Sequence, residues 1–107
     1  MSNTNQPLCC PPLQTSPLDQ VDAKRLADVF KALADPARLT LLSHIASQGE
    51  ACACDLPQII NKSQPTTSHH LSQLVACGLL HREQRGKWAW FSPNRGRLAE
   101  LRDALGD

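Results

Sequence analysis

The fold is decided by residues 61–80, NKSQPTTSHHLSQLVACGLL, which predict a single amphipathic helix between two turn signals. Ser63 is a good N-cap residue, and Pro65 is tolerated in the first turn of a helix. We expect the helix to run to about Ala76 and Gly78 to end it. A capped helix of this length can bury one face and leave the other in solvent.

The two faces of this helix differ in chemistry. Leu71 and Leu74 are apolar at helical spacing, and Thr67 lies one turn before Leu71, so all three should face the core. Short polar side chains occupy the opposite face of the first two turns. Such groups at the start of a helix can bond base edges and phosphates in the major groove of DNA. The residues of this segment that we predict to contact DNA are Ser63, Gln64, Pro65, Thr66, Ser68, His69 and Ser72.

Two longer helices are predicted before this segment. Residues 19–33 repeat apolar side chains at helical spacing. The second helix has Asp35 as its N-cap and Pro36 at its first position, and Gly49 ends it. Its apolar stripe, which we expect to face the core, consists of Leu39, Leu42 and Ile45.

The elements on either side of the capped helix complete the predicted fold. Residues 50–52 should be extended and residues 55–60 should form a short helix. After the capped helix, LLHREQRGKWAWFSP contains two extended runs around Arg85 and Gly86, which predict a β-hairpin. A closing helix follows, with an apolar face of Leu98, Leu101 and Leu105. This order predicts a mainly α fold with a small β-hairpin, a winged helix-turn-helix.

The predicted hairpin carries a local basic cluster of Arg82, Arg85 and Lys87, of which we predict that Arg85 and Lys87 contact phosphates. The formal net charge of the chain is only +1, so nucleic-acid binding must depend on such local clusters. The hairpin also holds three aromatic residues, at least one of which should pack on the core: Trp88, Trp90 and Phe91.

The chain of 107 residues is long enough for one compact domain. Residues 1–18 are rich in proline and have no helical pattern, so we predict a flexible arm there and a single domain over residues 19–107. No signal segment and no run of about 18 apolar residues is present, which favours a cytoplasmic protein without a membrane partner.

The 5 cysteines are an odd number, which argues against a closed disulfide framework. In a reducing cytoplasm, paired cysteines favour metal binding or redox chemistry.

Several segments of the chain, FKALADPARLTLLSHI, CACDL, SQPTTSHHLSQL, CGLL and RGKWAWFSP, resemble the ArsR/SmtB family of metal- and metalloid-responsive transcriptional repressors. The resemblance covers about residues 22–105 and is strongest to the arsenical-resistance repressors. It implies a homodimer whose interface is formed by the first and last helices. It also implies binding to double-stranded operator DNA with an imperfect inverted repeat, and dissociation when an inducer binds. A protein of this kind is not an enzyme.

Two cysteine pairs, Cys9 with Cys10 and Cys52 with Cys54, are the predicted inducer ligands. The soft centres As(III) and Sb(III), like soft divalent cations, prefer thiolate ligands. At the start of the short helix, the sulfurs of Cys52 and Cys54 can turn to one point, and the helix dipole should lower their pKa. In the family, CxC after a short strand is an inducer-site motif, and some members add cysteines from an N-terminal arm. We therefore expect Cys9 and Cys10 to supply the missing ligands.

The arsenical pattern of the family often has a third cysteine three residues after the second, where this chain has Pro57. A wholly local site of three thiols is therefore not expected, and Cd(II), Pb(II) or Zn(II) are alternative inducers. A thiol redox sensor with the same fold is a further alternative, and a thiol-based metal buffer or redox enzyme is a distant one.

Cys77 stands alone and is expected to be structural. The last helix has no histidine, so the His and carboxylate site of some family members should be absent.

Overall fold

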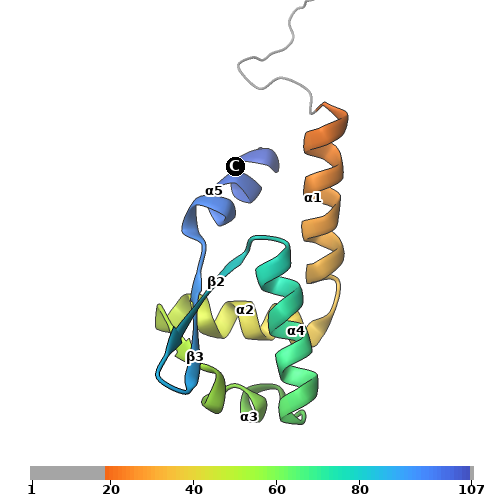
Figure 1. The fold of residues 1–107 in the computed structure, drawn as a ribbon. Coiled ribbons are helices and arrows are strands. Elements are labelled where there is room, and N and C mark those ends of the chain that lie inside the picture. Colours follow the sequence, from red (N-terminus) through yellow and green to blue (C-terminus); the bar gives the residue numbers. More distant parts are fainter. Residues whose placement is uncertain (1–18, 107) are drawn as a thin grey trace, which may run out of the picture.

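The computed structural model describes residues 19–106 and shows α-helices around a 3-stranded antiparallel sheet (Figure 1). The helices are α1 (Gln20–Leu33), α2 (Pro36–Gln48), α3 (Pro57–Ile60), α4 (Gln64–Ala76) and α5 (Arg95–Ala104). The strands are β1 (Ala51–Cys52), β2 (Leu80–Arg85) and β3 (Trp88–Pro93), and a 3₁₀ turn, η1 (Ala53–Asp55), follows β1. This order confirms the predicted mainly α winged helix-turn-helix. The predicted arm, with Cys9 and Cys10, lies outside the described residues.

Capping side chains begin α2 and α4 where the sequence predicted. Asp35 Oδ1 accepts hydrogen bonds from the backbone N–H groups of Ala37 and Arg38 at 2.8 and 3.3 Å. Ser63 Oγ accepts one from the N–H of Thr66 at 3.3 Å. Partial burial alone would raise the pKa of Asp35, but the two N–H groups and the Arg38 charge hold that pKa below its usual value. These caps satisfy donors that have no partner inside the helix, and so fix where each helix starts.

The sheet has the strand order β1-β3-β2. β2 and β3 form the predicted hairpin, and Gly86 and Lys87 are the turn between them. Gly86 has a φ of 61°, in the left-handed region that glycine adopts without steric cost. β1 pairs with β3, and Cys52 lies opposite Trp90. The sequence indicated an extended segment at β1 but not its partner strand.

The hydrophobic core lies between α2, α4 and the sheet. Its buried residues are Val29, Leu41, Leu42, Ile45, Ala51, Leu56, Leu71, Leu74, Leu79, Leu80 and Phe91. Phe91 confirms that an aromatic residue of the hairpin packs on the core. The predicted inward face of α4 is also confirmed, because Thr67 is buried together with Leu71 and Leu74.

One predicted core position on α2 is wrong. Leu39 is 51% exposed, whereas Leu41 is 0% exposed. Leu39 stands three residues before Leu42, and Leu41 stands four residues before Ile45, so the sequence allowed two stripes with helical spacing. The packing of α2 against α4, α3 and β3 selects the stripe that contains Leu41.

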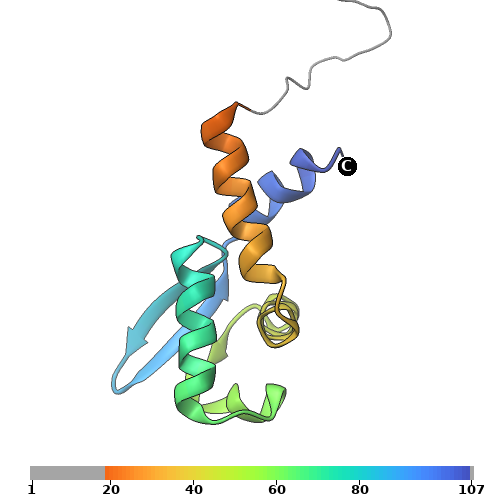
Figure 2. The same cartoon turned by 90° about the vertical axis from the view of Figure 1, so that its right-hand side faces the viewer.

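The ends of the helices and the turn of the hairpin gather at two opposite ends of the molecule (Figures 1 and 2). The start of α4, the short helix α3 and the turn of the hairpin lie toward one end in both views. The start of α1 and the end of α5 lie toward the other. Within residues 19–106, no helix has the length and apolar character that crossing a membrane requires.

Replacing Leu41 with alanine should destabilise the protein by about 2–5 kcal/mol, because truncating a fully buried leucine leaves a cavity. Leu39→Ala, on the same helix, is the matched control and should change the free energy of unfolding by less than about 0.5 kcal/mol. Urea unfolding at one protein concentration measures both changes. Equal destabilisation by the two substitutions would contradict the observed rotation of α2.

Candidate nucleic-acid interface and thiol pair

The rotation of α4 about its own axis is fixed by its buried face. Thr67 is 1% exposed, and its Oγ1 donates a hydrogen bond of 2.8 Å to the backbone oxygen of Ser63. Leu71 and Leu74 are buried in the core on the same face. Because the Thr67 hydroxyl has a partner, this face is buried without an unpaired polar group. The rest of the first two turns is left to solvent.

Every residue that the sequence predicts as a DNA contact at the start of α4 is exposed: Ser63, Gln64, Pro65, Thr66, Ser68, His69 and Ser72. Two of these side chains also bond each other, since Ser63 Oγ donates to Thr66 Oγ1 at 3.0 Å. The positive end of the helix dipole lies at the same place and favours phosphate. The start of α4 therefore combines exposed polar side chains with a site suited to a phosphate group.

Arg38 connects α4 to the junction of α1 and α2, a contact that the sequence did not reveal. Its Nε donates to the backbone oxygen of Ala32 at 2.6 Å, and its Nη1 lies 3.2 Å from His70 Nδ1. Because a guanidinium has only donors, Nδ1 of His70 must accept this hydrogen bond. His70 thus helps to orient α4, whereas its neighbour His69 is exposed. The sequence shows only that a second histidine, His70, follows His69. Because Arg38 and His70 are 32 residues apart, no local spacing predicts their contact.

The two basic residues predicted to contact phosphate from the hairpin have different surroundings. Lys87 lies in the exposed turn. Arg85 donates to Glu50 at 2.8 and 3.2 Å and to Glu83 at 2.8 and 3.1 Å. The hydrogen bonds to Glu50 and Glu83 raise the pKa of Arg85, and the bond from Arg85 lowers the pKa of Glu50. These contacts leave about one of the five N–H donors of Arg85 for another partner, whereas Lys87 has three.

The sulfurs of Cys52 and Cys54 converge, although the two residues lie in different elements. Cys52 is in β1 and is 4% exposed, whereas Cys54 is in η1 and is exposed. Their Sγ atoms lie 2.6 Å apart, and both thiols are free. The backbone N–H of Cys54 also donates to Cys52 Sγ at 3.4 Å. The geometry agrees with the expectation that both sulfurs turn to one point.

The expected acidity of this thiol pair is wrong for Cys54. A hydrogen bond to Cys52, partial burial and the nearby charge of Asp55 raise the pKa of Cys54 to about 11. In addition, α3 begins at Pro57, so Cys54 is not at the N-terminus of an α-helix. Because a thiolate is the ligand, a metal or metalloid must displace the thiol protons, and its binding should release protons.

The thiol pair is not a complete metal site by itself. Within residues 19–106, no group of three or more histidine, cysteine, aspartate or glutamate side chains is placed to hold a metal ion. A closed site for a soft cation needs up to four ligands, and Cys52 with Cys54 supply two. Cys9 and Cys10, the predicted further ligands, lie outside the described residues.

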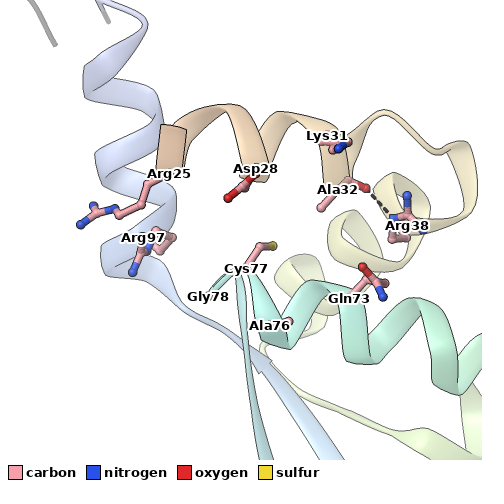
Figure 3. A pocket seen from close by; sticks show the side chains of 10 residues that line it. All are labelled: Arg25, Asp28, Lys31, Ala32, Arg38, Gln73, Ala76, Cys77, Gly78 and Arg97. Atoms are coloured by element: carbon pink, nitrogen blue, oxygen red, sulfur yellow. Dashed lines mark hydrogen bonds between the residues drawn. The ribbon is translucent and has the colours of Figure 1, made fainter. Parts of the chain in front are cut away.

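Cys77 lies apart from the thiol pair, at the end of α4. Its Sγ donates a hydrogen bond to the backbone oxygen of Leu74 at 3.4 Å. It lines a cleft of about 700 Å³ whose other side chains come from α1, α2, α4 and α5 (Figure 3). Two basic residues of this cleft, Arg25 and Arg97, lie within 3.6 and 3.8 Å of Glu100, which offsets their charge. None of the lining residues belongs to β1, η1 or α3.

A short helix, a tight turn, an exposed polar helix and a hairpin with a basic turn together define a winged helix-turn-helix DNA-binding regulator. Comparison with known proteins agrees with this class. The chain belongs to the arsR family of bacterial regulatory proteins, whose family model matches residues 35–82. The family consists of DNA-binding transcriptional regulators and not of enzymes.

Individual relatives show how far the similarity extends. The chain is 38% identical to the arsenical resistance operon repressor of Staphylococcus aureus, over 73% of this chain and 74% of that one. It is 39% identical to a cadmium resistance transcriptional regulatory protein CadC homolog of Staphylococcus aureus, over 71% and 63%. An ArsR-like transcriptional regulator from Rhodococcus sp. RHA1 has a similar structure, with a TM-score of 0.70 and 26% identity over 78% of each chain. The chain spans 88% of the length of one curated relative and 49% of another.

Proposed function

We propose that this protein is a homodimeric, cytoplasmic repressor that leaves its operator when As(III) or Sb(III) binds to cysteine thiolates. The observation that carries the proposal is the pair of converging sulfurs, Cys52 and Cys54, in a winged helix-turn-helix whose reading helix exposes its polar face. The similarity to an arsenical resistance operon repressor supports this choice of inducer.

The proposed DNA contacts lie at the start of α4 and in the turn of the hairpin. Gln64, Ser68 and His69 read base edges in the major groove, because amide, hydroxyl and imidazole groups can bond them. Lys87 holds a phosphate from the hairpin turn, and Arg85 adds at most a minor contact. The remaining proposed contacts on α4 position the helix on the DNA backbone: Ser63, Pro65, Thr66 and Ser72.

The proposed dimer uses apolar surface that a single chain leaves open. Val21, Phe30 and Leu105 are exposed on α1 and beyond the end of α5. These helices lie at the end of the molecule away from the hairpin turn (Figure 2). A two-fold dimer through this end would present two copies of α4 to half-sites about 34 Å apart on one face of an imperfect inverted repeat.

The proposed inducer site joins Cys52 and Cys54 to Cys9 and Cys10. A centre that binds both sulfurs joins Cys52 of β1 to Cys54 of η1. Ligand binding therefore acts on the backbone of both β1 and η1, which gives it a structural consequence.

A second candidate keeps the fold and the thiols but changes the inducer to Cd(II), Pb(II) or Zn(II). The similarity to a cadmium resistance regulatory protein favours it. Four thiolates would suit such a cation, whereas three suit As(III). Titrating the operator complex with arsenite, cadmium and peroxide in separate experiments distinguishes these inducers from thiol oxidation.

Replacing Gln64 with alanine should weaken operator binding by roughly 5- to 150-fold, the usual effect of losing a base contact, and should relax sequence preference. Gln73→Ala removes the same side chain from the other end of α4 and is the matched control.

Lys87→Ala should weaken binding to all sequences and reduce the slope of log affinity against log salt by about 1. Fluorescence anisotropy of labelled DNA measures these effects, and wild-type affinity in both Gln64→Ala and Lys87→Ala would contradict the proposed interface.

Replacing Cys54 with serine should leave operator binding intact and abolish release by arsenite, because a hydroxyl is a poor ligand for a soft centre. Cys54 is exposed, so the substitution should not disturb the core. Cys52→Ser should have the same effect on release, and Cys9→Ser with Cys10→Ser should weaken it.

Cys77→Ser is the control for the thiol substitutions and should respond to arsenite as the wild type does. The readout is the arsenite concentration that releases half of the labelled operator. Release of the Cys52→Ser/Cys54→Ser protein at the wild-type concentration would place the inducer site elsewhere.

A further inference from the structure

β1 joins the thiol pair to the hairpin. Cys52 is the second residue of β1 and lies opposite Trp90 on β3. Glu50 comes just before β1, two residues from Cys52. The central strand β3 pairs with both β1 and β2, so any shift of β1 acts directly on the hairpin.

The side chain of Glu50 makes a second connection to the hairpin. Its two carboxylate oxygens accept hydrogen bonds from Arg85 Nη1 and Nη2 at 3.2 and 2.8 Å. Arg85 is the last residue of β2, next to the turn, and its Cζ lies 4.9 Å from the centre of the Trp90 ring. Paired hydrogen bonds of this kind fix the orientation of a guanidinium as well as its position.

Glu83 contacts the same guanidinium but connects different parts of the molecule. It accepts hydrogen bonds from Arg85 Nε and Nη2 at 3.1 and 2.8 Å. Glu83 and Arg85 both belong to β2, so their contact holds the hairpin to itself. Glu50 alone of these two carboxylates connects Arg85 to the segment that carries Cys52.

We propose that Glu50 and Arg85 are positioning residues that transmit inducer binding at Cys52 and Cys54 to the hairpin, an inference that rests on the proposed function. An inducer held by both sulfurs pulls on β1, which has only two residues. Glu50 moves with β1 and draws Arg85, and with it the hairpin turn, out of its position. Lys87 then loses its place on the phosphate backbone.

This route is shorter than the route along the chain to α4. From Cys54, the chain passes through η1, α3 and the left-handed residue Asn61 before it reaches Ser63. The start of α4 is also held by the buried Thr67 hydroxyl. The hairpin turn has no comparable anchor in the core, because the residues on either side of it are exposed.

The test compares Glu50→Ala with Glu83→Ala, which remove the same charge and the same kind of contact from Arg85. Both carboxylates are exposed, so both variants should fold. The chain has 2 tryptophans, so a Trp88→Phe background leaves Trp90, opposite Cys52, to report arsenite binding by its fluorescence. Anisotropy of labelled operator, with and without saturating arsenite, gives the factor by which arsenite weakens DNA binding.

We expect Glu50→Ala to bind arsenite in the absence of DNA with an affinity within about 2-fold of the background protein. The factor by which arsenite weakens operator binding should fall by at least about 5-fold, since coupling between sites typically spans about 5- to 150-fold. Glu83→Ala should keep the factor of the background protein.

Three results would overturn the proposed coupling. Glu50→Ala could release operator as the background protein does, both variants could lose release equally, or Glu50→Ala could fail to bind arsenite in the absence of DNA. In each case the background protein still responds, so the proposed function stands and only the coupling fails. If the background protein binds no operator or does not release it with arsenite, the proposed function fails and the coupling with it.

Discussion

The burial of one face of α4 is the constraint on which the proposed DNA-reading surface depends. Thr67, Leu71 and Leu74 set the rotation of the helix, and the Thr67 hydroxyl is satisfied by the backbone oxygen of Ser63. The same residue, Ser63, caps the helix, so the start and the rotation of α4 are fixed together. Arg38 adds a connection from the junction of α1 and α2 to His70. The polar face is therefore presented by a helix that is held at its start and along its length.

The two-residue strand β1 links the thiols to the hairpin. Cys52 is almost fully buried and pairs across the sheet with Trp90, whereas Cys54 is exposed and its thiol faces Cys52. A ligand that binds both sulfurs must act on a strand that is also part of the wing. The raised pKa of Cys54 means that a centre that takes its thiolate must first displace the thiol proton.

Much of the fold could be predicted from the sequence because its signals are local. Asp35, Ser63 and Gly86 each act through their own backbone or that of near neighbours, and all three were placed correctly. The choice between Leu39 and Leu41 depends on packing against distant elements, so spacing alone could not decide it. The contact between Arg85 and Glu50 joins segments 35 residues apart, which no local pattern reveals. The raised pKa of Cys54 comes from near neighbours, but it depends on the direction in which the Cys54 thiol points, which the sequence does not give.

The central claim, that thiol binding and DNA binding oppose each other in one molecule, is tested most directly by equilibrium dialysis of arsenite against the protein with and without saturating operator DNA. Because linkage is reciprocal, an inducer that weakens DNA binding must bind the DNA-free protein more tightly by the same factor. The account predicts an arsenite affinity at least about 5-fold higher for the free protein than for the operator complex. Equal affinities for the two forms would contradict it.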